Sequence, residues 1–278
     1  MDIDLDAMLG VLALSRLGEN RYQAENLSLG GPVVFGGQIL AQAIVAAASG
    51  LDGLSVTTLH TVFARAATGA KPLEIDVVPI HRGRSFASAT VTFRQGERVC
   101  AQATALLSAE APDLIRHGDT WASAPPSAPP AGRPARGLRT EIADGVDIDD
   151  PDLVGPPDLD VWSRWGGAPD DPATSRALIA FATDSFLVAT AMRPHLGVGQ
   201  SQAHVTLSTG VLSHTITFHQ PCDAGSWLLL RQHSDFAGAG RTHGRGEIFT
   251  ADGQLVASFT QDGMIRPMPG GSAHAGRL

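Results

Sequence analysis

The sequence predicts an α+β protein built from two tandem units, each with one long helix wrapped by a curved antiparallel sheet. Three observations support this prediction. Similar short motifs recur in the two halves at a nearly constant separation. Each half contains one long and almost wholly apolar stretch, which is typical of a buried helix. Each of those stretches precedes several segments in which apolar and polar residues alternate, as they do in strands.

The recurring motifs indicate that one unit has been duplicated. They are separated by 154, 157 and 156 residues, and a near-constant offset of this kind is what a duplication leaves behind. The matched pairs are 59–63 with 213–217, 83–84 with 240–241, and 93–96 with 249–253. The first pair aligns His60 with His214.

The first unit is predicted over residues 1–110. Its helix is expected at about 37–49, because Gly36–Ala48 is rich in alanine and leucine and Gly50 follows it. The helix has no polar face to present to water, so the sheet must wrap around it. Strands are expected at Glu74–Ile80, Phe86–Phe93 and Val99–Leu107, with turns at Arg82-Gly83 and Gln95-Gly96.

The second unit is predicted over residues 173–267 and repeats this order. Its helix is expected at about 173–191. Strands are expected near 203–219, 226–235, 241–250 and 254–266, and Asp252-Gly253 is a strong hairpin turn signal.

Residues 111–172 are predicted to connect the two units across the outer surface without supplying a catalytic group. This segment contains 11 prolines, which cannot donate to the hydrogen bonds of a central strand. Trp162 and Trp165 indicate that its end packs down. Residues 268–278 are rich in glycine and predicted to form a flexible tail.

Composition excludes several classes of protein. The chain has 278 residues, 43% of them hydrophobic and 17% charged, which is typical of a globular protein. No apolar run approaches the ~20 residues of a membrane span. The start is acidic, unlike a signal peptide, and two cysteines exclude a disulfide scaffold. These features predict a cytoplasmic protein, and the arginine-rich, lysine-poor composition suggests a bacterial source.

Charge is concentrated in one segment. Residues 141–171 contain ten acidic residues and one arginine, whereas the net charge of the whole chain is −8. The remainder is therefore close to neutral and does not repel an anionic ligand. It is also too weakly basic to predict nucleic-acid binding.

Several catalytic and cofactor motifs are absent from the sequence. There is no G-x-S-x-G elbow, and the only lysine, Lys71, does not follow a glycine as a phosphate-binding loop requires. The glycine-rich segment 238–244 has the wrong spacing for a dinucleotide. His214 and His219 would point to opposite faces of a strand, so no shared metal is predicted.

Three residues are candidates for chemistry. Asp184 is the only charged residue between Ala177 and Met192, and a carboxylate in a buried helix must be hydrogen-bonded or functional. Alternatively, it caps a helix that begins there. Gln261 could orient a water or a carbonyl oxygen, or be an ordinary residue at the end of a strand. His214 is either part of the site or a core histidine. Strict alternation would place Val211 and Ser213 on one face, and His214 on the other.

Three sequence blocks resemble the type II acyl-CoA thioesterases, a bacterial and peroxisomal family with a double hotdog fold. They are Val34–Ala43, Leu212–His219 and Val256–Arg266, and the likeness extends from about residue 8 to 267. Their order and spacing make the resemblance specific at the level of the family.

The resemblance implies hydrolysis of acyl-CoA to a free fatty acid and CoA by an activated water. The family holds that water with an Asp, a Thr or Ser, and a Gln. The Asp and the Gln correspond to Asp184 and Gln261, which are expected to face one another across an apolar pocket. The hydroxyl position corresponds to Val211, which has no hydroxyl, so Ser213 is the candidate to replace it.

The resemblance also implies how the substrate binds. The helix start at Gly36, Gly37 and Gln38 is expected to bind the thioester carbonyl, with Val211 and His214 beside it. Free N–H groups at a helix start stabilise a developing oxyanion. Neither a metal nor a separate cofactor is expected, since CoA is part of the substrate. The family also allows a homo-oligomer.

Two questions remain open from the sequence. Arg82, Arg84 and Arg241 could contact the CoA phosphates or simply be solvated. The missing hydroxyl at Val211 also allows an alternative function, a non-catalytic or weakly catalytic acyl-CoA binding protein. A hydratase on the same fold is not supported, because the Asp and His motif it needs is absent.

Overall fold

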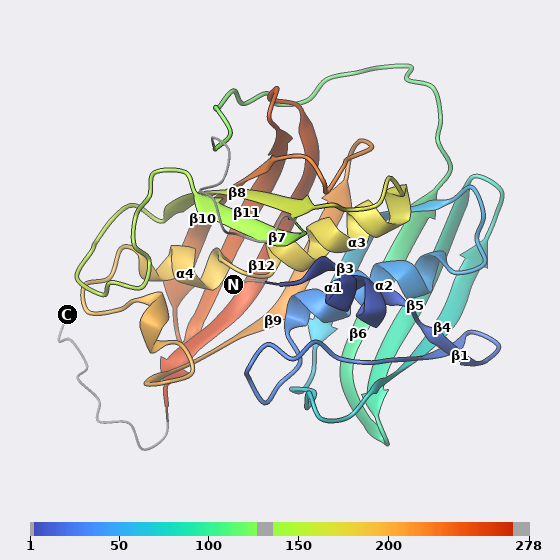
Figure 1. Ribbon diagram of the computed structural model, residues 1–278, viewed down its shortest axis with the longest axis horizontal. Coiled ribbons are helices and arrows are strands. Elements are labelled where there is room, and N and C mark those ends of the chain that lie inside the picture. The colour runs from blue at the N-terminus through green and yellow to red at the C-terminus, as the bar shows by residue number, and fades with distance from the viewer. Residues whose placement is uncertain (1–2, 127–135, 269–278) are drawn as a thin grey trace.

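The computed structural model of the protein describes residues 3–126 and 136–268, and a single twelve-stranded antiparallel sheet dominates it (Figure 1). The strands of the first half are β1 (Ser15–Gly18), β2 (Arg21–Ala24), β3 (Ser55–Phe63), β4 (Leu73–Arg82), β5 (Phe86–Gln95) and β6 (Arg98–Ser108). Those of the second half are β7 (Gly137–Ile142), β8 (Asp158–Gly166), β9 (Leu207–Phe218), β10 (Leu228–Gly238), β11 (Arg241–Thr250) and β12 (Leu255–Pro267).

The strand order shows the duplication directly. Across the sheet the strands run β1-β2-β4-β5-β6-β3 and then β9-β12-β11-β10-β8-β7. The second series is the first in reverse, as a twofold relation about the β3–β9 pair requires. Each unit is two strands, a helical segment and four strands in chain order. The α+β class and the two tandem units are therefore confirmed.

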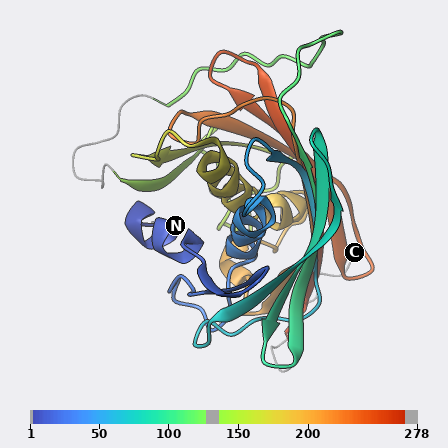
Figure 2. The same ribbon diagram turned by 90° about the vertical axis from the view of Figure 1, so that its right-hand side faces the viewer.

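The helices lie inside the curve of the sheet, as Figure 2 shows in the end-on view. They are α1 (Leu5–Leu12), α2 (Gly36–Ala48), α3 (Pro172–Thr183) and α4 (Leu187–Met192), with a short 3₁₀ turn at Gln200–Gln202. Helix α2 is buried almost all round, as its apolar sequence predicts. Because its small residues leave room, α3 packs directly against it.

The prediction for residues 111–172 is wrong in part, because β7 and β8 lie within this range. Strand β8 pairs with both β7 and β10 and buries Trp162 and Trp165, so the packing expected of the two tryptophans is confirmed. The prolines at 151, 156 and 157 fall between the two strands and do not interrupt them. Composition averaged over the segment hid this arrangement. Most of the predicted tail, residues 269–278, lies outside the described residues.

The second long helix is broken into α3 and α4 by Asp184, Ser185 and Phe186. Taken together, Pro172–Met192 spans 21 residues and is apolar enough to cross a membrane by length and composition alone. Uninterrupted apolar runs in the sequence do not reveal this length, because Arg176 and Asp184 lie within the segment. In the structure, 78% of the most apolar window is buried inside the protein. The segment is therefore covered by the sheet and by α2.

The two histidines that the repeat aligned are not equivalent. His60 is exposed on the outer face of β3, whereas His214 is fully buried on the inner face of β9. In the β3–β9 ladder His214 lies opposite Thr61 instead. Thr61 and His214 both face inward and are 153 residues apart, and a strand alternates its faces with a period of two. Equivalent residues of β3 and β9 must therefore be separated by an odd number. The offset of 154 is therefore one residue out of register for this strand.

Candidate active site

The start of α2 contacts the end of α3, and two glycines make this approach possible. A Cβ on Gly37 would collide with the backbone oxygen of Phe181. A Cβ on Gly36 would lie 2.6 Å from Oδ2 of Asp184. No larger residue fits at either position without displacing one of these groups. The sequence block that begins α2 thus places its first backbone N–H groups beside the carboxylate of Asp184.

Asp184 directly follows α3 as its C-cap residue and does not cap α4, so the capping alternative is excluded. It has helical backbone angles, and the cap position of α4 is occupied by Phe186, which makes no side-chain cap bond. The Gly37 backbone N–H donates to the Asp184 carboxylate. The Oδ1 atom of Asp184 is buried and has no hydrogen-bond partner among the described residues.

The environment of Asp184 favours a proton on its carboxyl group. Burial raises the pKa of Asp184 from 3.8 to about 8, and the hydrogen bond from Gly37 opposes this only in part. The partial positive charge at the start of α2 also acts against the shift. A carboxyl group whose pKa lies near the operating pH is well matched to proton transfer.

His214 connects the sheet to the segment that carries Asp184. Its Nε2 atom lies 3.0 Å from Oγ1 of Thr183, and that hydroxyl donates to the Ala180 carbonyl oxygen at 2.8 Å. Thr183 must therefore accept, so Nε2 of His214 carries the proton. Burial lowers the pKa of His214 to about 3, which keeps the ring neutral. The ring also stacks on Phe259, with 5.7 Å between centroids.

Gln261 lies on the inner face of β12, directly opposite His214. Its side chain is buried, and neither amide atom has a hydrogen-bond partner in the described part of the chain. The inner-face glycines around it contact α4. A Cβ on Gly244 would lie 2.9 Å from a Leu187 methyl, and one on Gly263 would lie 3.0 Å from a Val188 methyl. Gln261 is thus below the helix that begins three residues after Asp184.

A β-bulge corrects the expected positions of Val211 and Ser213. Ser213 pairs with Asp262, but Val211 pairs with Gly263, so Leu212 is an extra residue on β9. Paired residues point to the same face, and therefore Val211 shares the inner face with Gly263 while Ser213 points outward. The Ser213 hydroxyl donates to Oδ2 of Asp262 at 2.7 Å. The prediction that the two residues share a face is wrong, and Ser213 is directed away from Asp184.

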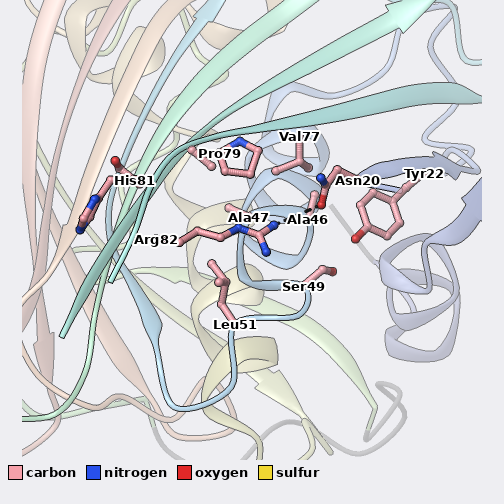
Figure 3. Close-up of a pocket in the computed structure, with 12 residues that line it drawn as sticks. Asn20, Tyr22, Ala46, Ala47, Ser49, Leu51, Val77, Pro79, His81 and Arg82 are labelled. Atoms are coloured by element: carbon pink, nitrogen blue, oxygen red, sulfur yellow. Dashed lines mark hydrogen bonds between the residues drawn. The ribbon is translucent and has the colours of Figure 1, made fainter. Parts of the chain in front are cut away.

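The side chains of Gln38 and Arg82 are directed to other parts of the molecule. The Gln38 amide is fully used within the chain, since its oxygen accepts from the Leu27 N–H and its nitrogen donates to Asn26. Arg82 lies beside Ala46 and Ala47, at the opposite end of α2 (Figure 3). Thirteen helical residues span roughly 18 Å, which separates Arg82 from the start of α2. Arg84 lies in the β4–β5 turn and Arg241 at the start of β11.

A cavity of about 340 Å³ lies beside the break between α3 and α4. Ser185 and Phe186, which directly follow Asp184, form part of its wall. Residues of β7 and the loop after it supply most of the remainder, namely Leu138, Thr140, Ile142, Val146, Asp147, Ile148 and Asp149. Apolar side chains thus line much of the cavity, and two aspartates lie at its wall. Among the described residues, no group of three or more His, Cys, Asp or Glu side chains is placed to hold a metal.

Two family models match consecutive parts of the chain. Residues 24–108 match the acyl-CoA thioesterase N-terminal domain, and residues 110–265 match the acyl-CoA thioesterase C-terminal domain. The chain belongs to the type II acyl-CoA thioesterase family. The second match includes β7 and β8, which agrees with their place in the second unit of this thioesterase fold.

Relatives of known name agree with this assignment. Acyl-CoA thioesterase 2 of Haemophilus influenzae is 27% identical over 94% of this chain and 98% of its own length. Mouse acyl-coenzyme A thioesterase 8 is 29% identical over 96% of this chain and 91% of its own. The crystal structure of acyl-CoA thioesterase II TesB2 from Mycobacterium marinum superposes with a TM-score of 0.78 and 29% identity, covering 96% of this chain and all of that one.

Two features near Asp184 are not among the predictions from the sequence. One is Thr183, whose hydroxyl joins His214 to the segment that carries Asp184. The acidic residues Asp147 and Asp149 were assigned to an outer connector, yet they line the cavity next to Ser185. The apolar residues that precede Thr183 in the sequence were the available signal for the first. Nothing in the local sequence pointed to the second, because the contact spans more than 30 residues.

Proposed function

We propose that the protein hydrolyses acyl-CoA thioesters to a free acid and CoA, with Asp184 as the general base. The observation that carries this proposal is the Asp184 carboxyl itself. It is buried, raised in pKa, held over the start of α2, and left with an unpaired oxygen Oδ1. Buried polar atoms are nearly always hydrogen-bonded, so Oδ1 is suited to accept from a substrate water.

The proposed reaction has two steps. The oxygen of a water attacks the thioester carbonyl carbon, while a proton of that water passes to Asp184. The resulting tetrahedral intermediate carries its negative charge on the former carbonyl oxygen, next to the first N–H groups of α2. Its C–S bond then breaks, the sulfur takes the proton from Asp184, and the free acid and CoA thiol leave.

We assign Gln261 to hold the attacking water. In the neutral ring of His214, Nδ1 has a free lone pair and no partner among the described residues. Gln261 lies opposite on the same inner face, so its NH₂ group can donate to that nitrogen. The Gln261 carbonyl oxygen is then available to accept the second proton of the water. His214 acts here as a positioning residue.

The alternative is an acyl-CoA binding protein with little or no turnover. Only the missing hydroxyl at Val211 favours it. Incubating the purified protein with acyl-CoA of several chain lengths and measuring released thiol separates the two functions. Release of thiol that depends on enzyme concentration supports hydrolysis. Saturable binding of acyl-CoA without release would establish the alternative.

We assign the cavity beside Ser185 and Phe186 to the acyl chain. It adjoins Asp184 along the chain, and its wall carries Asp147 and Asp149 within the acidic segment. These carboxylates disfavour the anionic phosphates of CoA, so the uncharged acyl end is the better occupant. With a volume of about 340 Å³, the cavity is large enough to hold part of an acyl chain.

Val146→Trp tests this assignment by filling the cavity. We expect the ratio of kcat/KM for decanoyl-CoA to that for butanoyl-CoA to fall about tenfold or more, because overpacking a binding cavity excludes the longer chain. Val154→Trp is the matched control, since Val154 is 54% exposed in the same loop region and does not line the cavity. An unchanged ratio in Val146→Trp would show that the acyl chain lies elsewhere.

A further inference from the structure

Thr242 on β11 presents a buried hydroxyl to the same inner face as Gln261. Its side chain is 4% exposed, and in the β11–β12 ladder it lies opposite Gly263. Because Gly263 has no side chain, Thr242 can lean over it. A Cβ on Gly263 would lie only 2.5 Å from Oγ1 of Thr242.

The position of this hydroxyl relative to Val211 follows from the ladder. Gly263 pairs with Thr242 on one side and with Val211 on the other. The hydroxyl of Thr242 thus lies over Gly263 on β12, and β12 pairs directly with β9, the strand that carries Val211. Neighbouring strands are about 4.8 Å apart, so the hydroxyl lies about one strand spacing from the inner face of Val211.

The same ladder places Thr242 next to Gln261. Gln261 pairs with Gly244, two residues along β11 from Thr242, so the two side chains are diagonal neighbours on one face. Diagonal pairs of this kind lie within reach of long side chains. The methyl of Val188, at the start of α4, covers the other side of the Gly263 position at 3.0 Å. The hydroxyl is therefore enclosed between the sheet and the helix that follows Asp184.

We propose that Thr242 is a third catalytic residue, whose hydroxyl hydrogen-bonds the water that Asp184 and Gln261 hold. An enclosed water typically makes about three hydrogen bonds, and Asp184 and Gln261 supply two. Val211 supplies none, while Ser213 donates to Asp262 on the outer face. Thr242 provides the remaining contact from the neighbouring strand, across a glycine that leaves the space open. This inference rests on the proposed hydrolysis.

A set of exchanges at positions 242 and 211 tests the proposal. Thr242→Val keeps the shape of the side chain and removes the hydroxyl, and we expect kcat to fall about tenfold or more. Thr242→Ser keeps the hydroxyl and should retain most of kcat. In the double variant Thr242→Val with Val211→Thr, a hydroxyl returns on the adjoining strand, and we expect kcat to recover to within a few fold of the wild type.

Thr92→Val is the matched control. Thr92 is a buried threonine on β5, the strand of the first unit that corresponds to β11. The substitution Thr92→Val should therefore leave kcat unchanged. Recovery in the double variant supports a hydroxyl that acts on the water, because a packing defect at position 242 would not be repaired from β9. If Thr242→Val does not fold, Thr242→Ala replaces it.

Two results would overturn the inference while leaving the proposed function intact. One is a wild-type kcat in Thr242→Val, and the other is a loss that Val211→Thr does not restore. Failure of the proposed function itself looks different, since the wild type would then release no thiol from any acyl-CoA.

Discussion

Replacing Asp184 with asparagine should lower kcat for acyl-CoA hydrolysis by about 10²–10⁴-fold, the usual contribution of a general base. The asparagine side chain has nearly the same shape, and its oxygen can still accept from the Gly37 N–H. The loss should therefore reflect chemistry and not misfolding. Release of CoA thiol under saturating substrate measures it. Asp152→Asn, a change of the same kind on an exposed loop, should keep the wild-type kcat.

The same substitution should change how stability depends on pH. Asp184 has a pKa of about 8 in the folded protein against 3.8 ordinarily, so between these values the folded state binds a proton that the unfolded state lacks. This group therefore makes the wild type less stable as pH rises, by about 1.4 kcal/mol per pH unit, until the pKa of about 8 is passed. Asp184→Asn removes this slope.

Denaturant unfolding of both proteins at pH 5 and pH 8 measures the difference. We expect the free energy of unfolding of Asp184→Asn minus that of the wild type to be larger at pH 8 than at pH 5. An equal difference at both would contradict the raised pKa.

Gly37→Ala should destabilise the protein by about 2–3 kcal/mol, because the added methyl meets the backbone oxygen of Phe181 and α2 must move away from α3. Chemical denaturation measures this change. Gly10→Ala is the matched control, since Gly10 also lies in a helix but a methyl there meets no atom within 4 Å. That control should be more stable than the wild type by up to about 1 kcal/mol. A wild-type stability in Gly37→Ala would show that the helices do not need this close approach.

The fold could be predicted because its signals repeat and are local. The apolar stretch at Gly36–Ala48 specifies a buried helix, and the alternating segments after it specify strands. Strands β7 and β8 were missed because the prolines between them dominated the composition of residues 111–172. The break between α3 and α4 was not predicted, because the apolar sequence continues from Ala177 to Met192 with Asp184 as its single charged residue.

The candidate site was only partly predictable, because some of its features depend on contacts between segments that are far apart in the sequence. Asp184 is conspicuous in the sequence as a lone charge in an apolar segment. The faces of Val211 and Ser213 could not be predicted, because one extra residue in β9 inverts the alternation and only the pairing with β12 reveals it. Thr242 could not be selected either, since its relevance depends on Gly263, a residue on the neighbouring strand.

The pH dependence of kcat/KM, followed by the loss of thioester absorbance, tests the role of Asp184 most directly. With a base of pKa about 8, kcat/KM should rise about tenfold per pH unit below that value and become constant above it. In Asp184→Asn the residual rate should lack this rise. A wild-type profile that is flat between pH 6 and 9, or the same rise in Asp184→Asn, would contradict Asp184 as the base.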